Sequence, residues 1–191
     1  MTTFTVYNSN TGQISRTGSC PADHVALQPQ TGESVVAVSA NPMTQYINVS
    51  TQALETFPAS PGQYYIWDWP TKTWILPANA LAQAQADQVK TVTATYSAAI
   101  QAPVSYMATT FQADAGSQAT LNKVLTVANG TVPAGFYWVD AANNQVAMTF
   151  AQLQGLASAM WAQGWTAFQE LQTKKAAIAA ATTIAAVQAI V

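Results

Sequence analysis

The pattern of the sequence changes abruptly at Pro77. Before Pro77, short runs of alternating apolar and polar residues are separated by turns rich in Gly, Pro and Asn, which is typical of short strands. After it, apolar residues from Leu81 to Ile100 recur every three to five positions, which is helical spacing. We therefore predict an α+β protein with a small N-terminal antiparallel β domain (1–77), a connector helix (78–103) and a helix-rich C-terminal domain with a β-hairpin (104–191).

Three strand pairs are expected in the N-terminal domain. Each pair consists of two short runs suited to one buried face, joined by a segment rich in turn-forming residues. The predicted pairs are FTVY (4–7) with QISR (13–16), SVVAV (34–38) with QYINV (45–49), and YYIWDW (64–69) with TWIL (73–76).

The first half of the C-terminal domain mixes strand and helix signals. One or two strands are expected just after Pro103, and Asp114 is a suitable N-cap for a helix that Asn129 and Gly130 close. FYWV (136–139) and QVAM (145–148) flank an Asn-rich loop. Because Asn tolerates the left-handed conformations of tight turns, this stretch predicts a β-hairpin.

A long helix is expected to follow Thr149. Thr149 and Gln152 match a capping box, in which each side chain satisfies a backbone donor of the first helical turn. The helix continues towards Ile178, and Thr182 or Thr183 caps a last short helix. The helix carries a broad apolar stripe, composed of Phe150, Leu153, Leu156, Met160, Trp161, Trp165, Phe168 and Leu171.

Charged residues make up only 7% of the chain, against about 25% in ordinary soluble proteins. A surface with so few charges resists self-association poorly, which favours a chain buried in an assembly and packed as a homo-oligomer. Compositional drift towards Ala, Gln and Thr is the alternative. The net charge of −2 includes no basic patch, so we expect no nucleic-acid binding. We also expect no signal peptide and no membrane span.

Two short clusters carry residues with chemical potential. Cys20, Asp23 and His24 lie within five residues, and a Cys–His pair can act as nucleophile and base. Asp140, with the two Asn residues that follow, offers oxygens to a cation, but a calcium loop of the EF-hand kind needs more carboxylates. We interpret the first cluster as an exposed loop and the second as a turn. We therefore expect no catalytic residues, no metal site and no cofactor.

Aromatic residues are concentrated in one predicted hairpin. Tyr65, Trp67, Trp69 and Trp74 are the candidate core or interface anchors. In a strand Tyr65, Trp67 and Trp69 share one face, and Asp68 lies on the other. Because a lone buried charge is very costly, the face opposite Asp68 is the better candidate for burial. A small internal core, a protein interface and a sugar-stacking platform all remain open for these rings.

Several segments resemble proteins of tailed bacteriophages. WVDAANNQVAMTFAQLQGLASAM (138–160) and LQTKKAAIAAATTIAAVQAI (171–190) resemble a C-terminal domain of unknown function found in tail-fibre and fibre-assembly proteins, and FQADAGSQATL (111–121) is similar to the segment that precedes it there. The N-terminal segments YNSNTGQISRTG (7–18) and QYINV resemble the β region of small phage tail proteins. This chain departs from those relatives in carrying fewer charges in its helices.

The resemblance implies a non-enzymatic structural component of a phage tail end, in the baseplate or at the fibre attachment. Its partners would be other phage tail proteins, and its location the virion tail after synthesis in the host cytoplasm. A tail-fibre assembly chaperone absent from the mature virion is the first alternative. A sugar-binding module for host recognition is the second.

Overall fold

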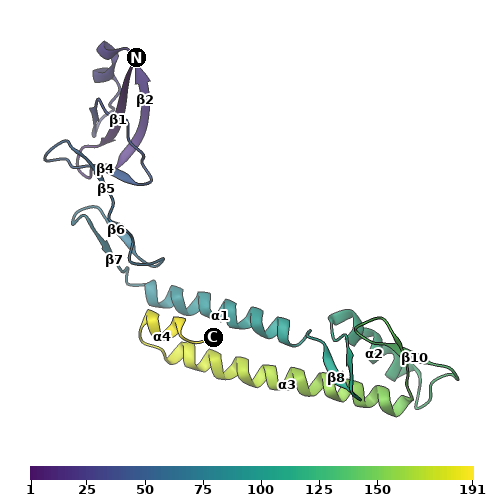
Figure 1. Cartoon of the computed structure of the whole chain (residues 1–191). Coiled ribbons are helices and arrows are strands. Elements are labelled where there is room, and N and C mark those ends of the chain that lie inside the picture. The colour runs from purple at the N-terminus through teal and green to yellow at the C-terminus, as the bar shows by residue number, and fades with distance from the viewer. The chain divides into compact units, whose positions relative to one another are not determined.

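The computed structural model describes all residues from 1 to 191, and the chain forms two compact units. Unit 1 spans Met1–Ala80 and unit 2 spans Leu81–Val191, so the division falls close to Pro77. Small antiparallel sheets and several helices confirm the predicted α+β class (Figure 1). Each unit is described by itself below.

Unit 1 is built on a three-stranded antiparallel sheet in the order β2-β1-β3. The sheet is composed of β1 (Thr2–Asn8), β2 (Ile14–Cys20) and β3 (Glu33–Val36). The predicted pairing of the first two strands is confirmed, with a bulge between Val6 and Tyr7. The central strand is buried along Phe4–Tyr7, so both of its faces are covered, because successive side chains point to opposite faces of a sheet.

The second predicted strand pair is wrong. β3 pairs with β1, and the expected partner of β3, β4 (Gln45–Ile47), pairs instead with β5 (Leu54–Thr56). Pairing with β3 covers the free edge of β1, which is an apolar strand. Just after β3, the carbonyl of Val38 accepts a hydrogen bond of 2.8 Å from the hydroxyl of Thr5. The intervening segment turns at Asn41 through both its backbone and its side chain, so it does not close a hairpin.

Gly12 lies where the turn between β1 and β2 meets β4. Its φ of +75° is left-handed, and a Cβ built on it would lie 1.8 Å from the carbonyl oxygen of Ile47. The amide of Ile47 donates a hydrogen bond of 2.9 Å to the carbonyl of Gly12. Ile47 is fully buried against Tyr7 and Ile14. This contact therefore joins the first hairpin to the second strand pair.

Unit 1 is completed by a short 3-10 helix, Ala22–Leu27, and by the hairpin β6–β7. β6 (Ile66–Asp68) pairs with β7 (Thr73–Ile75), which confirms the predicted aromatic hairpin. Trp67 lies directly opposite Trp74 in this hairpin, and Ile66 lies opposite Ile75.

Unit 2 follows the predicted order of elements, and α1 (Ala80–Ala99) belongs to it apart from its first residue. The rest of unit 2 consists of β8 (Val104–Tyr106), β9 (Thr109–Phe111), α2 (Ala115–Val127), β10 (Tyr137–Val139), β11 (Gln145–Ala147), α3 (Phe150–Ala180) and α4 (Ile184–Gln188). Strands β8 and β9 form one hairpin, and β10 and β11 form the other.

The three predicted helix caps of unit 2 are confirmed. Asp114 accepts hydrogen bonds from the amides of Gly116 and Ser117 at the start of α2. Thr149 and Gln152 form the reciprocal capping box of α3, and Thr183 caps α4. Local side chains therefore fix where each of these helices begins.

The main core of unit 2 lies between the first half of α3, α2 and the two hairpins. Phe111, Leu121, Leu153 and Leu156 are its largest fully buried side chains. Glutamine side chains also connect α1 with α3 by donating hydrogen bonds to carbonyls at helix ends. Gln85 of α1 donates to the carbonyls of Ile178 and Ala181, both at 3.1 Å. In the same way Gln163 of α3 donates to Ala99 and Ala102, at 2.9 and 2.8 Å.

Two glycines of α3 are expected to respond oppositely to alanine. A Cβ at Gly155 would lie 2.0 Å from the hydroxyl and 2.6 Å from Cζ of Tyr106, whereas a Cβ at Gly164 would meet nothing within 4 Å. Gly155→Ala should therefore destabilise the protein by about 1–2 kcal/mol, because the Tyr106 ring must move. Gly164→Ala should stabilise it by about 0.5–1 kcal/mol, because it removes backbone freedom from a helix interior. Urea unfolding followed by far-UV circular dichroism measures both, and equal shifts would contradict the close approach of Tyr106.

Candidate interaction surfaces

Five aromatic rings form one cluster in unit 1, which we call the aromatic cluster: Tyr46, Phe57, Trp67, Trp69 and Trp74. Trp67 has the central position, with ring centroids 4.9 Å from Phe57 and 5.4 Å from Trp74. Both pairs cross at steep angles of 78° and 72°, the edge-to-face geometry that aromatic rings prefer. Tyr46 is buried, whereas Phe57 and the three Trp residues are half-buried.

Three of the four predicted anchor residues lie in this cluster, and the fourth does not. Trp67 contacts both Trp69 and Trp74, and all three contact rings from outside the hairpin, whereas Tyr65 makes no ring pair with them. Tyr65 precedes β6, and its amide bonds to the carbonyl of Gly62 at 3.2 Å. The regular alternation that placed Tyr65 with the tryptophans does not extend past the end of the strand.

The indole nitrogens of the cluster are satisfied unequally. Nε1 of Trp74 donates to the carbonyl of Pro58 at 2.8 Å, whereas the buried Nε1 of Trp67 has no hydrogen-bond partner. Asp68 lies away from the rings, as expected, because it caps the hairpin turn: it accepts hydrogen bonds from the amide and hydroxyl of Thr71. These bonds from Thr71 lower the pKa of Asp68.

A small polar network borders the aromatic cluster. The hydroxyl of Tyr46 donates to one carboxylate oxygen of Glu55, and the amide of Asn48 donates to the other at 2.7 Å. The ammonium of Lys72 lies 4.9 Å from the ring centroid of Trp69 and 5.3 Å from that of Tyr46, within range of cation–π attraction. Burial lowers the pKa of Lys72, and the charge of Glu55 opposes that shift.

The hydroxyl of Tyr46 is expected to lose its proton at a higher pH than an ordinary tyrosine, because its pKa is raised. Its hydrogen bond to Glu55, together with burial and the Glu55 charge, raises its pKa to about 12. The unfolded value is about 10, so this bond stabilises unit 1 below pH 10 and its contribution is lost as the pH rises towards 12. The difference in tyrosinate absorbance between the wild type and Tyr46→Phe should therefore appear near pH 12. A difference centred at the ordinary tyrosine value would show that the bond to Glu55 is not formed in solution.

The two clusters considered for chemistry have ordinary structural surroundings. Cys20 ends β2 as a free thiol, and Asp23 and His24 form an exposed pair 3.8 Å apart in the 3-10 helix that follows. Asp140 accepts hydrogen bonds from the amides of Ala142 and Asn144, both at 2.8 Å, and thereby closes the turn between β10 and β11. No group of three or more His, Cys, Asp or Glu side chains is arranged to hold a metal ion.

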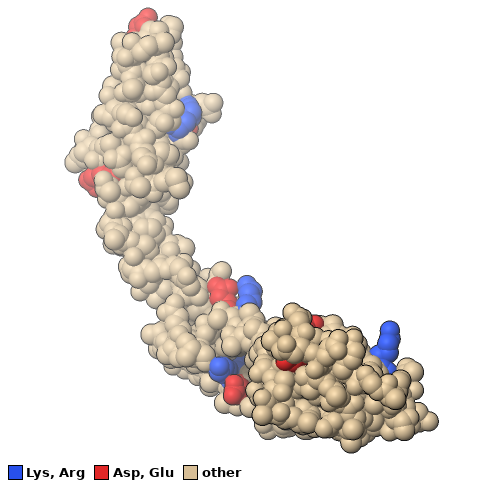
Figure 2. Space-filling view, turned by 45° about the vertical axis from the view of Figure 1, so that its right-hand side comes forward, with Lys and Arg blue, Asp and Glu red and all other residues tan.

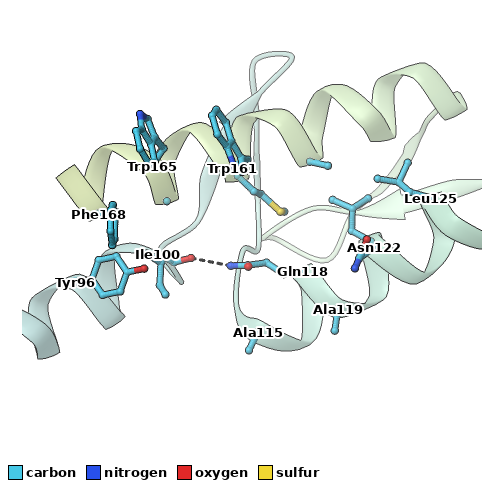
Figure 3. A pocket seen from close by; sticks show the side chains of 14 residues that line it. Tyr96, Ile100, Ala115, Gln118, Ala119, Asn122, Leu125, Trp161, Trp165 and Phe168 are labelled. Atoms are coloured by element: carbon cyan, nitrogen blue, oxygen red, sulfur yellow. Dashed lines mark hydrogen bonds between the residues drawn. The ribbon is translucent and has the colours of Figure 1, made fainter. Parts of the chain in front are cut away.

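Unit 2 carries an open groove of about 820 Å³, which we call the helical groove (Figure 3). Three helices line it. Helix α1 contributes Tyr96, and Ile100, the residue just after α1, also lines the groove. Its other residues are Ala115, Gln118, Ala119, Leu121, Asn122 and Leu125 of α2, and Ala157, Met160, Trp161, Gly164, Trp165 and Phe168 of α3. The side chain of Gln118 spans part of the groove and donates to the carbonyl of Ile100 at 2.8 Å.

Exposed aromatic rings form one wall of the groove. Trp161, Trp165 and Phe168 are 69%, 47% and 40% exposed, and they follow one another along one side of α3. The planes of Trp161 and Trp165 are parallel to within 1°, with centroids 6.1 Å apart, and Phe168 continues the stack at 5.8 Å. No residue that lines the groove is charged. On the face drawn in Figure 2, the few charged side chains are scattered over an otherwise uncharged surface.

Residues 67–191 match the protein family described as Domain of unknown function (DUF4376). The chain belongs to the DUF4376 family. The matched segment contains all of unit 2 and the β6–β7 hairpin from Trp67 onwards. The DUF4376 segment therefore includes three tryptophans of the aromatic cluster, but not Tyr46 and Phe57, on which they pack. No curated protein and no solved structure matches this chain. None of its helices is both long enough and apolar enough to cross a membrane.

Proposed function

We propose that this chain is a non-enzymatic structural component of a bacteriophage tail end, in the baseplate or at the fibre attachment. It acts by packing against other tail proteins within the virion, after synthesis in the host cytoplasm. The observation that carries the proposal is the helical groove. An uncharged hollow bordered by three exposed aromatic rings is the kind of surface that a permanent interface covers.

The composition of the chain supports burial in an assembly. With charged residues at 7%, few charged groups are present to keep one copy apart from another or from a neighbour. Interface cores are depleted in charge and enriched in Trp, Tyr and Phe, and the groove has both properties. The resemblance to tail-fibre and fibre-assembly proteins supports the same kind of assembly. Its segments at 111–121, 138–160 and 171–190 lie inside the DUF4376 match, whose description names no function.

A tail-fibre assembly chaperone is the second candidate, because an open apolar groove also suits transient binding of an unassembled partner. The sugar-binding alternative has less support. Stacking on a sugar requires an open ring face, and the faces of Trp67 are occupied by steep contacts with Phe57 and Trp74.

Quantitative mass spectrometry of purified virions tests the proposal. The sample would be mature particles of the phage that encodes this chain, compared with tail precursors from a mutant blocked in head assembly. We expect the chain in both, at a fixed ratio to the other tail proteins. Presence in precursors alone would establish the chaperone instead, and absence from both would overturn a role in the tail.

A further inference from the structure

The helical groove has the properties of a surface that pairs with itself. We propose that its occupant is the helical groove of a second copy of this chain, in a two-fold dimer. This inference rests on the proposed function, because it names one of the partners that a structural tail component would pack against.

The groove presents protruding rings and a hollow side by side. The rings are Trp161, Trp165 and Phe168, which stand out from α3 (Figure 3). The hollow between α2 and α3 is lined by residues with little or no side chain, among them Ala115, Ala119, Ala157 and Gly164. A Cβ added at Gly164 would meet nothing within 4 Å, so space remains there.

This combination satisfies the requirement of an isologous interface. In a two-fold dimer the same patch meets itself, so each patch must supply both the projection and the cavity that receives it. A cavity of about 150 Å³ holds one benzene molecule. The groove, at about 820 Å³, is therefore large enough to receive the two indoles and the phenyl ring of a facing copy.

The electrostatics of the groove also favour a second copy. Any charge close to the two-fold axis would face its own equivalent and repel it. None of the lining residues is charged, so self-pairing brings no like charges together. The groove likewise offers no charge that would select a complementary charged partner.

The orientation of the rings argues against a sugar as the occupant. The ring planes of Trp161 and Trp165 are parallel and face one another along the helix, so ring edges rather than faces point outwards. Edges of this kind suit interdigitation with another set of side chains. A pyranose ring requires an open aromatic face, and the faces with which Trp161 and Trp165 meet along the row are not open.

The exposed area fits a dimer of moderate affinity. At about 150–250 Å² for each aromatic side chain, the three rings leave roughly 230–390 Å² exposed on each copy. A standard interface buries about 800 Å² on each partner. The rings would thus supply between about a quarter and a half of that area, with Tyr96, Ile100 and the floor of the groove adding to it. Dissociation in the micromolar range is the expected result.

Sedimentation equilibrium of the full chain tests the pairing. We expect the wild type to pass from monomer to dimer across the micromolar range. Trp165→Arg should raise the dimer Kd at least about tenfold, because two added cations would face an uncharged surface. Tyr137→Arg is the matched control, because Tyr137 is also 47% exposed but lies in β10, outside the groove. The dimer Kd of this variant should differ from that of the wild type by less than about twofold.

A second variant separates loss of pairing from loss of folding. Trp161 is 69% exposed, so Trp161→Gln should leave far-UV circular dichroism and hydrogen exchange of α3 unchanged while raising the Kd at least about tenfold. A wild type that stays monomeric throughout, or a dimer whose Kd neither variant changes, would overturn the inference.

Photo-crosslinking identifies the occupant. A benzophenone amino acid would replace Trp161 in unlabelled chain, mixed with 15N-labelled wild type. We expect crosslinks from the unlabelled to the labelled chain that end within α2 or α3 at the groove; crosslinks confined to other segments would contradict the proposal. The virion measurement is independent of this result. A solution dimer absent from tails would overturn the proposed function alone, and a monomer present in tails would overturn this inference alone.

Discussion

Gly12→Ala is expected to destabilise unit 1 by about 4 kcal/mol. A Cβ at this position would lie 1.8 Å from the carbonyl oxygen of Ile47, and backbone on both sides leaves no flexible side chain to move aside. The added cost combines left-handed strain of about 1–2 kcal/mol with the loss of the Ile47–Gly12 hydrogen bond, about 1–3 kcal/mol. The displacement of fully buried Ile47 from its core adds to both.

Hydrogen-exchange mass spectrometry locates this effect within the chain. Peptides from β1, β2 and β4 should lose protection in Gly12→Ala, while α2 and α3 of unit 2 keep theirs. Gly32→Ala is the control for backbone strain, since Gly32 has φ of +82° and nothing within 4 Å of a built Cβ. It should cost only about 1–2 kcal/mol. Equal loss of protection in the two variants would mean that the contact with Ile47 contributes nothing.

Trp67→Ala is expected to remove about 3 kcal/mol from the stability of unit 1. The ring of Trp67 contacts four others of the aromatic cluster, so truncation leaves a cavity between Tyr46, Phe57 and Trp74. Losses for buried Trp→Ala lie at about 3–5 kcal/mol, and the lower end suits a ring that is only half-buried. Urea unfolding, combined with exchange of peptides from β4 to β7, measures the loss.

Ile66→Ala is the matched control on the same strand. Ile66 is 50% exposed, so its truncation should cost less than about 1 kcal/mol. The comparison also separates the roles open to the aromatic hairpin. If Trp67→Ala leaves stability intact but prevents assembly of tails, the cluster is an interface anchor. If folding and assembly both survive and only adsorption to host glycan is lost, receptor binding replaces the structural interpretation.

Local signals in the sequence were sufficient to predict where most helices start and where most hairpins form. Asp114, Thr149 and Thr183 cap helices through side chains bonded to amides two or three residues away, so short windows of sequence contain the whole interaction. The hairpins at 66–75 and 137–147 are equally local. The pairing of β3 with β1 is not local, because it depends on an apolar strand edge about thirty residues earlier.

The aromatic cluster and the helical groove were only partly foreseeable. Alternation in 45–49 predicts a strand with one buried face, but no local signal shows that Tyr46 and Phe57 would join the tryptophans. Helical spacing likewise places Leu156, Trp161 and Trp165 in one apolar stripe. The structure buries Leu156 fully and leaves both tryptophans exposed, because the buried positions of α3 form a narrower stripe and the tryptophans lie beside it. Periodicity predicts an apolar face but not how much of it finds a partner.

The glutamine contacts between helices have a consequence for the conditions in which unit 2 can persist. The last carbonyls of a helix lack partners within it and are commonly met by Lys, Arg or a glycine turn. In unit 2, neutral side-chain amides donate hydrogen bonds to these carbonyls. Gln85 donates to the end of α3, and Gln118 and Gln163 donate to carbonyls at the end of α1. An amide neither titrates nor attracts counterions. The association of α1 with α3 should therefore change little between fresh water and brine, or between acid and alkaline surroundings.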